Sequence, residues 1–167
     1  QLRKHDEIVC EIALHVDDGL GFAKTRKVEA EVRQIIEDAF KCKWHSIERG
    51  QPFEFCGYGM IERNDGFYLN VNAFIKAKVR EITVEKGRRV TDELRLHERA
   101  AMQTTVGQLR WVSRVSLQIG HELHRGASWM TNSDARIQHL QKMNHLIRYI
   151  QREPPQLCLP RLNADEK

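Results

Sequence analysis

The hydrophobic pattern of the first forty residues predicts a β-hairpin followed by an amphipathic helix. Residues 9–16 are mostly apolar and β-branched, which favours a buried strand. Residues 19–23 form a short apolar run with a glycine on each side of Leu20, which indicates a return strand after a tight turn. Apolar residues then recur at helical spacing over residues 24–42, where Thr25 is placed to cap the helix. We therefore expect a stiff, buried hairpin with one helix packed on its sheet.

A second hairpin is predicted from an aromatic run. Residues 53–61 alternate aromatic and aliphatic side chains with other residues, which indicates one strong strand. The sequence Arg-Asn-Asp-Gly at residues 63–66 is typical of a hairpin turn, and the return strand is expected over residues 67–69. Residues 43–47 fit an edge strand. The first seventy residues therefore predict an antiparallel sheet.

The remainder of the chain has helical periodicity. A helix capped by Asn70 or Asn72 is expected to end near residue 82, and a charged, turn-like segment follows. A long helix begins near His97, and Gly120 is expected to break or bend it.

A last helix is expected to start after Asn132 or Ser133 and to end before the Pro154-Pro155 pair, while residues 156–167 indicate a linker or a fraying tail. The predicted fold class is α+β, an antiparallel sheet with a packed helix, followed by a helical module.

Composition narrows the functional classes only slightly. The 27 basic and 23 acidic residues give a net charge of +4 and a pI near 9.0, which permits a nucleic-acid partner without requiring one. The four cysteines have no C-x-x-C spacing, which favours a reducing compartment. No apolar run is long enough for a membrane span and no signal peptide is visible. We expect an intracellular protein, cytoplasmic or nuclear, that does not bind membranes and is not secreted; the start at Gln1 suggests a piece of a longer protein.

Two adjacent carboxylates, Asp17 and Asp18, are the main candidates for chemistry. They separate the two apolar runs of the first hairpin, so they are expected at its tip. Neighbouring like charges repel each other, and a divalent cation such as Mg²⁺ or Mn²⁺ would neutralise them through hard oxygen ligands. The sequence Asp-Asp-Gly is also ordinary hairpin-turn chemistry. From these residues alone, both interpretations stay open.

Five blocks, in order over about residues 8–152, resemble the C-terminal half of a reverse transcriptase of the copia-type LTR retrotransposon family. The first block, Leu-His-Val-Asp-Asp at residues 14–18, is similar to the family's Tyr-Val-Asp-Asp motif, and the helix that ends near Phe40 is the second. Residues 55–69 resemble the Phe-Leu-Gly-Ile-x-Ile hairpin. Residues 106–111 (VGQLRW) are close to the Gly-x-Leu-x-Trp helix, and residues 139–150 are placed like the helix that ends in Arg-Tyr-Leu.

The resemblance implies an RNA-directed DNA polymerase that transfers nucleotides with two Mg²⁺ or Mn²⁺ ions. Asp17 and Asp18 would be the catalytic metal ligands, with Asp17 the better candidate because neighbours on a hairpin point to different faces. The implied partners are an RNA template with its DNA primer, a dNTP, and the rest of a Pol polyprotein, with fingers and palm upstream and ribonuclease H downstream. The implied divisions are palm over residues 1–70, thumb-like helices over 71–155 and a linker over 156–167.

The same resemblance implies two further sets of site residues. The second hairpin would grip the primer end, through Phe55, Gly57, Tyr58 and Gly59. Basic residues of the thumb would contact the nucleic-acid backbone through phosphate; they are Lys76, Lys78, Arg80, Arg88 and Arg89. Each basic residue could equally belong to an ordinary solvated face.

Two departures from the family pattern limit these expectations. His15 stands where the family has an aromatic residue, and residues 114–119 do not keep the Thr-Arg-Pro-Asp signature. The family also requires an aspartate from a strand upstream of Gln1, so we expect no polymerase activity from this chain alone. The alternatives are a non-catalytic nucleic-acid-binding module, or a decayed retrotransposon reading frame without function.

Overall fold

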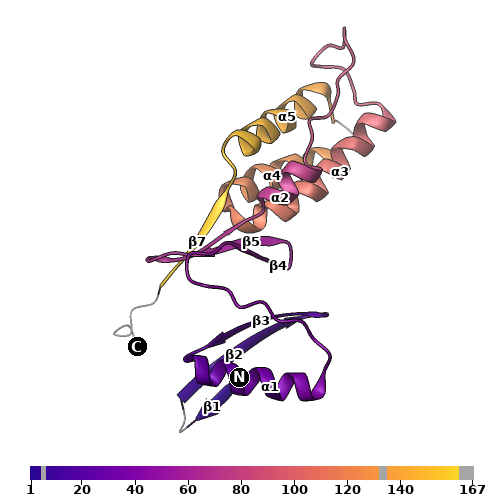
Figure 1. Ribbon diagram of the computed structural model, residues 1–167. Coiled ribbons are helices and arrows are strands. Elements are labelled where there is room, and N and C mark those ends of the chain that lie inside the picture. The colour runs from indigo at the N-terminus through magenta and orange to yellow at the C-terminus, as the bar shows by residue number, and fades with distance from the viewer. Residues whose placement is uncertain (5–6, 132–134, 162–167) are drawn as a thin grey trace.

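The computed structural model describes residues 1–4, 7–131 and 135–161, and arranges them in four layers. In Figure 1 α1 and the first β-sheet lie together in the lower part of the view, the second β-sheet lies above them, and a group of helices lies at the top. Both sheets are antiparallel throughout. The predicted α+β class and the antiparallel pairing are therefore confirmed.

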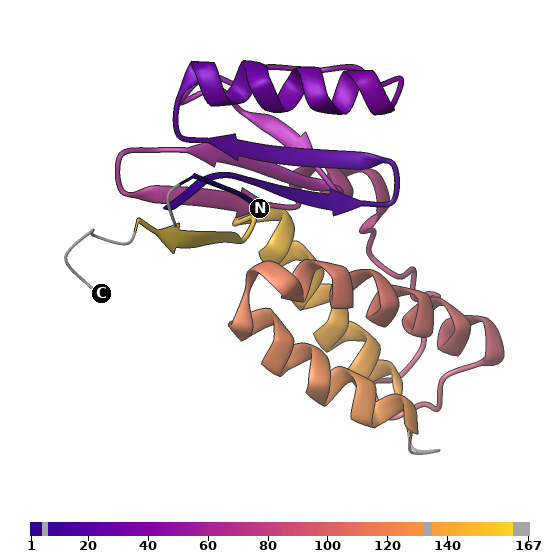
Figure 2. The ribbon, with the colours of Figure 1, turned by 90° about the horizontal axis from the view of Figure 1, so that it is seen from below.

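The first sheet has the strand order β1-β2-β3 and carries helix α1 on one face. The elements are β1 (Leu2–Lys4), β2 (Glu7–His15), β3 (Asp18–Ala23) and α1 (Arg26–Ala39). The hydroxyl oxygen of Thr25 accepts a hydrogen bond from the backbone N–H of Val28 at 3.3 Å, which confirms the predicted cap. Val28 and Val32 of α1 pack with Cys10 and Ile12 of β2. Figure 2 shows α1 lying along the outer side of this sheet.

The prediction that the first hairpin is buried is wrong. Val9 and Cys10 are buried at the start of β2, but Leu14 is 80% exposed and Val16 is 94% exposed. Alternation along β2 and β3 places Phe22 on the face opposite Cys10, and its ring meets Phe67 of the second sheet edge to face, with 5.7 Å between the centroids. Among the described elements, α1 makes the main helix contacts with this sheet, and they do not cover its apolar tip.

The second sheet has four strands in the order β4-β5-β6-β7. They are β4 (Phe53–Phe55), β5 (Tyr58–Glu62), β6 (Gly66–Asn70) and β7 (Gln156–Pro160). The expected single strand over residues 53–61 is therefore interrupted. Cys56 and Gly57 form a two-residue turn, with φ angles of 50° and 76°. Positive φ at both central residues is the geometry of a type I′ hairpin turn.

The C-terminal segment is part of this sheet, which corrects the prediction of a linker over 156–167 for its described part. β7 pairs with β6 along its whole length, from Gly66 opposite Pro160 to Asn70 opposite Gln156. A Cβ atom on Gly66 would lie 2.2 Å from the carbonyl oxygen of Leu159, so only glycine allows this approach. β7 forms because its apolar residues cover an otherwise unpaired edge of β6; residues 162–167 lie outside the described chain.

The helices that follow α1 lie between β6 and β7 in the sequence. They are α2 (Asn72–Lys78), α3 (Leu96–Val112), α4 (Leu117–Thr131) and α5 (Ile137–Arg152), with a 3-10 turn over Ser113–Val115. α2 ends earlier than predicted, and the long helix breaks at the 3-10 turn, whereas Gly120 lies inside α4. The caps proposed at Asn132 and Ser133 lie outside the described residues, and residues 43–47 form no strand.

The main hydrophobic core lies among these four helices. Its fully buried members include Met102, Leu109, Ile137, Leu140 and Ile147. The second sheet joins this core through partly buried side chains, Tyr58, Leu69 and Leu157. The helices and the second sheet thus share one core, while the first sheet has a separate, smaller cluster with α1.

Candidate functional site

The acidic pair lies at the tip of the first hairpin, at the position that the sequence predicts. Val16 and Asp17 form a two-residue turn, and Asp18 begins β3 opposite His15 of β2. Both aspartates are exposed. The turn therefore presents two successive carboxylates to solvent at one end of the sheet.

Val16 holds this turn in a strained conformation. Its φ angle is 56°, in the left-handed region that a β-branched residue rarely adopts. Glycine is the usual residue at a turn position with positive φ. Strain of this kind costs about 1–3 kcal/mol per residue and is concentrated at functional sites. Val16 is nearly fully exposed, so the burial of its own side chain does not offset that cost.

The electrostatics of the pair suit a cation. In the part of the chain that the structure describes, neither the Asp17 nor the Asp18 side chain forms a hydrogen bond or an ion pair. Two neighbouring carboxylates without a compensating charge are the oxygen ligands that Mg²⁺ and Mn²⁺ prefer. The described residues contain no group of three or more His, Cys, Asp or Glu side chains that could hold a metal ion. The pair fits such an ion chemically, but it would supply only part of the six-coordinate shell of Mg²⁺.

The glycines of the second hairpin make room for side chains of the same protein. A Cβ atom on Gly57 would lie 3.3 Å from Cζ2 of Trp111, and one on Gly59 would lie 2.9 Å from Oδ1 of Asn70. That oxygen of Asn70 accepts a hydrogen bond from the backbone N–H of Asn72 at the start of α2. Both close approaches therefore link the hairpin to the helices behind it. Phe55 and Tyr58 are half-buried and face each other as register partners of β4 and β5, directly beside the turn.

The two hairpin turns lie at the same end of the structure, although about forty residues separate them in the sequence. Partial desolvation raises the pKa of the Cys56 thiol, and the negative charge of Asp18 raises it further. Asp18 therefore lies within electrostatic reach of the second turn. Figure 1 shows both turns at the same end of their sheets, on the right of the view.

Trp111, near the end of α3, is the main contact behind the second turn. Its ring lies 5.1 Å from that of Tyr58 and 6.2 Å from that of Phe74, between centroids. The guanidinium of Arg114 lies over the same indole, 4.5 Å from its centroid. The sequence analysis used Trp111 only as part of a motif and did not single out Arg114. Their roles depend on how α3 meets the hairpin, which no local pattern specifies.

The five predicted phosphate contacts have different environments. Lys76 and Lys78 are exposed on α2. Arg80 donates hydrogen bonds to the backbone carbonyls of Val79 at 2.8 Å and Lys76 at 2.6 Å, so it closes the end of α2. Arg89 is exposed and pairs with Asp92 at 3.3 Å.

Arg88 is the clear exception to the prediction of a phosphate contact. Its side chain is 11% exposed and donates to both carboxylate oxygens of Glu98, at 3.0 and 3.2 Å, while the Glu98 side chain is 1% exposed. Arg88 therefore neutralises a buried carboxylate and is not presented to a nucleic acid. Its partner lies ten residues further along the chain, a spacing that gives no signal in the sequence.

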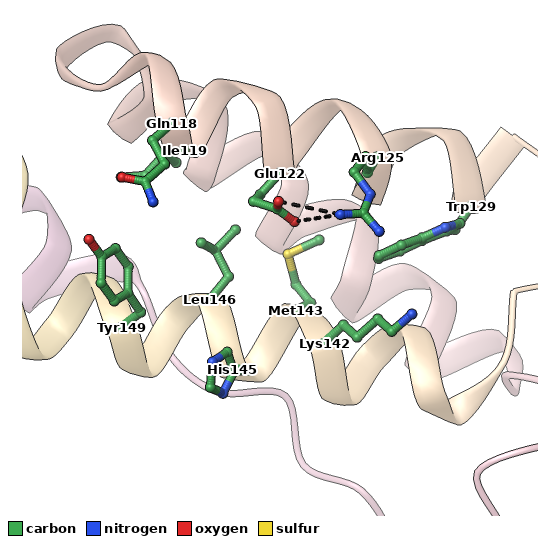
Figure 3. A pocket seen from close by; sticks show the side chains of 10 residues that line it. All are labelled: Gln118, Ile119, Glu122, Arg125, Trp129, Lys142, Met143, His145, Leu146 and Tyr149. Atoms are coloured by element: carbon green, nitrogen blue, oxygen red, sulfur yellow. Dashed lines mark hydrogen bonds and ion pairs between the residues drawn. The ribbon is translucent and has the colours of Figure 1, made fainter.

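A separate groove of about 410 Å³ lies between α4 and α5. Figure 3 shows Trp129 and Lys142 at one end of it, and Tyr149 and Gln118 at the other. Trp129 stacks on His139 with 4.8 Å between ring centroids, and Lys142 lies 5.4 Å from the Trp129 centroid. Burial, together with the nearby cations, lowers the pKa of His139. Because α4 and α5 alone form this groove, it is distinct from the site at the two hairpins.

Comparisons with known proteins leave the family open. No protein-family model, no curated protein and no solved structure matches this chain. Among the described helices, none is both long and apolar enough to cross a membrane.

Proposed function

We propose that this chain supplies palm and thumb elements of a copia-type reverse transcriptase. The observation that carries the proposal is that the two hairpin turns lie at the same end of the two sheets, with Asp18 of the first turn within electrostatic reach of Cys56 of the second. A polymerase needs its metal-binding carboxylates beside the element that holds the primer end. The strained Val16, next to Asp17, supports a functional role for the first turn.

In this proposal each part of the chain has a defined role. Asp17 and Asp18 hold divalent cations, which when bound activate the primer hydroxyl and stabilise the charge of phosphoryl transfer. The second hairpin, residues 53–62, holds the primer end beside them. Lys76 and Lys78, exposed on α2, offer charge to the nucleic-acid backbone. The assignment of residues 71–155 to a thumb belongs to the same proposal.

The 167-residue chain is expected to show no primer extension by itself. The family requires a third carboxylate from another strand, and the described residues bring no such group to Asp17 and Asp18. The measurement is extension of a labelled primer on an RNA template with Mg²⁺ or Mn²⁺ and all four dNTPs. Robust, template-dependent extension would show that two carboxylates suffice and that the assignment of roles is wrong.

Binding of Mn²⁺ tests the acidic pair directly. We expect Asp17→Asn to weaken Mn²⁺ affinity about tenfold, which corresponds to ~1.4 kcal/mol, because one of two oxygen ligands loses its charge. Asp18→Asn should have a smaller effect, since its side chain points to the other face of the hairpin. Isothermal titration, or electron paramagnetic resonance of free Mn²⁺, gives the affinities.

The matched control for this titration is Glu122→Gln, which removes the same charge from an exposed position on α4. Its Mn²⁺ affinity should equal that of the wild type. Equal affinities for wild type and Asp17→Asn would favour the second candidate, a non-catalytic nucleic-acid-binding module in which the aspartates only form a turn. The full exposure of the hairpin tip is the observation that favours this candidate.

A further inference from the structure

Arg114 is an exposed arginine with a fixed platform and no ionic partner. It lies in the 3-10 turn Ser113–Val115, directly after α3. Its guanidinium carbon is 4.5 Å from the centroid of the Trp111 ring. Within the described chain its side chain forms no ion pair. A guanidinium over the face of an indole is attracted to the ring and can still present its N–H donors to a ligand.

The position of Arg114 is set by the second hairpin. Trp111 touches the turn at Gly57, where a Cβ atom would lie 3.3 Å from the indole, and it packs against Tyr58. Through this ring, Arg114 is held beside the turn that Asp18 reaches. Arg80 and Arg88, by contrast, use their donors on backbone carbonyls or on Glu98.

We propose that Arg114 binds a phosphate of the nucleic-acid backbone at the second hairpin, with Trp111 as the positioning residue that holds its guanidinium. A guanidinium recognises phosphate through two parallel N–H donors, and its position over an indole face restricts the orientations that these donors adopt. The assignment rests on the proposed polymerase function, and it adds a specific contact that the sequence analysis did not contain.

The test is the affinity of the purified chain for a fluorescein-labelled RNA–DNA primer–template duplex, measured by anisotropy over a series of salt concentrations. Arg114→Gln should weaken binding about tenfold, as expected for the loss of a charge-assisted hydrogen bond. It should also reduce the slope of log affinity against log salt by about 1, because one phosphate fewer is neutralised. A purely structural role would leave this slope unchanged.

Lys86→Gln is the matched control. Lys86 is exposed, has no ionic partner in the described part of the chain, and lies in the loop between α2 and α3, which Figure 1 shows at the far end of the molecule. Lys86→Gln changes the net charge by the same amount as Arg114→Gln. Because Lys86 lies far from the second hairpin, its loss should leave the salt slope near the wild-type value. Arg114→Lys keeps the charge without the planar fork, and it should keep the slope while losing part of the affinity.

Trp111→Leu tests the platform. It should weaken duplex binding. Arg114→Gln should have less effect in the Trp111→Leu background than in the wild type, because the indole that positions the Arg114 guanidinium is already absent. Circular dichroism of each variant establishes that it is folded.

The possible results separate the two proposals. If the wild type binds duplex and Arg114→Gln behaves like Lys86→Gln, the Arg114 assignment is overturned and the polymerase proposal stands on the Mn²⁺ titration. If the wild type binds no duplex even at low salt, the Arg114 assignment and the nucleic-acid part of the proposed function fail together, whatever the Mn²⁺ affinity.

Discussion

Replacing Glu98 with alanine is expected to lower the free energy of unfolding by about 3–5 kcal/mol, the cost of breaking a buried ion pair. The Glu98 carboxylate, 1% exposed, accepts two hydrogen bonds from Arg88. It also accepts one from the backbone N–H of Arg95 at 2.7 Å, at the first turn of α3. The substitution therefore removes the buried counter-charge of Arg88, which keeps only Asp92 as an acidic partner at 3.4 Å. It also removes a helix cap and opens a space in the protein interior.

The measurement is urea unfolding followed by circular dichroism, with two comparisons. Glu122→Ala removes an exposed glutamate that pairs with Arg125 on α4, and it should change the free energy of unfolding by less than about 1 kcal/mol. Glu98→Leu combined with Arg88→Met replaces both charges with apolar groups, and it should regain much of the loss. Equal stability of wild type and Glu98→Ala would mean that this buried pair does not organise the start of α3.

Replacing Asn144 with leucine is expected to lower the free energy of unfolding by about 2–6 kcal/mol. Asn144 is buried in α5, and its amide satisfies both backbone groups of Ile82: Oδ1 accepts from the N–H at 2.8 Å, and Nδ2 donates to the carbonyl at 2.7 Å. Leucine has a similar size and neither function, so a buried donor and a buried acceptor stay unpaired, at about 1–3 kcal/mol each.

Thermal and urea unfolding of two more variants make this prediction specific. Gln151→Ala removes a single bond from the same helix, to the carbonyl of Val79 at 3.1 Å, and it should cost about 1 kcal/mol. Asn144→Asp can donate to the Ile82 carbonyl only when its carboxyl is protonated. The folded state therefore raises the pKa of that carboxyl, so its stability should be greatest below the unfolded pKa of about 4 and should fall as the pH rises. A pH-independent stability for this variant would contradict the bonding described.

Short-range patterns predicted the elements whose geometry is local. The apolar, β-branched run of residues 9–16, the glycines after Asp18 and the position of Thr25 predicted the first hairpin, its tip and the cap of α1, all of which the structure has. The interruption at Cys56 could not be seen in the same way. Aromatic residues at alternate places predict a continuous strand, and nothing in this pattern indicates that Cys56 has a positive φ.

Features that depend on distant partners were the ones that sequence reasoning missed. β-branched residues at the first tip predicted burial, but burial also needs a covering element, and Leu14 and Val16 have none among the described residues. Arg88 reads as a surface cation until its buried partner Glu98 is known. For the candidate site, the sequence identified the carboxylates and the second hairpin. The position of Trp111 behind the second turn depends on the packing of α3, which the sequence does not show.

The return of the chain to β6 limits how the helical module can move. All four helices after the second hairpin leave the sheet at Asn70 and come back to it at Gln156, and these two residues are register partners. The helical module is thus connected to the sheet at both of its ends, through the adjacent strands β6 and β7. It therefore cannot rotate about a single covalent connection. Any movement of the module toward a bound duplex must change the backbone at both connections together. Deletion of residues 156–161 would leave the module with one connection to the sheet, and we expect it to move more freely.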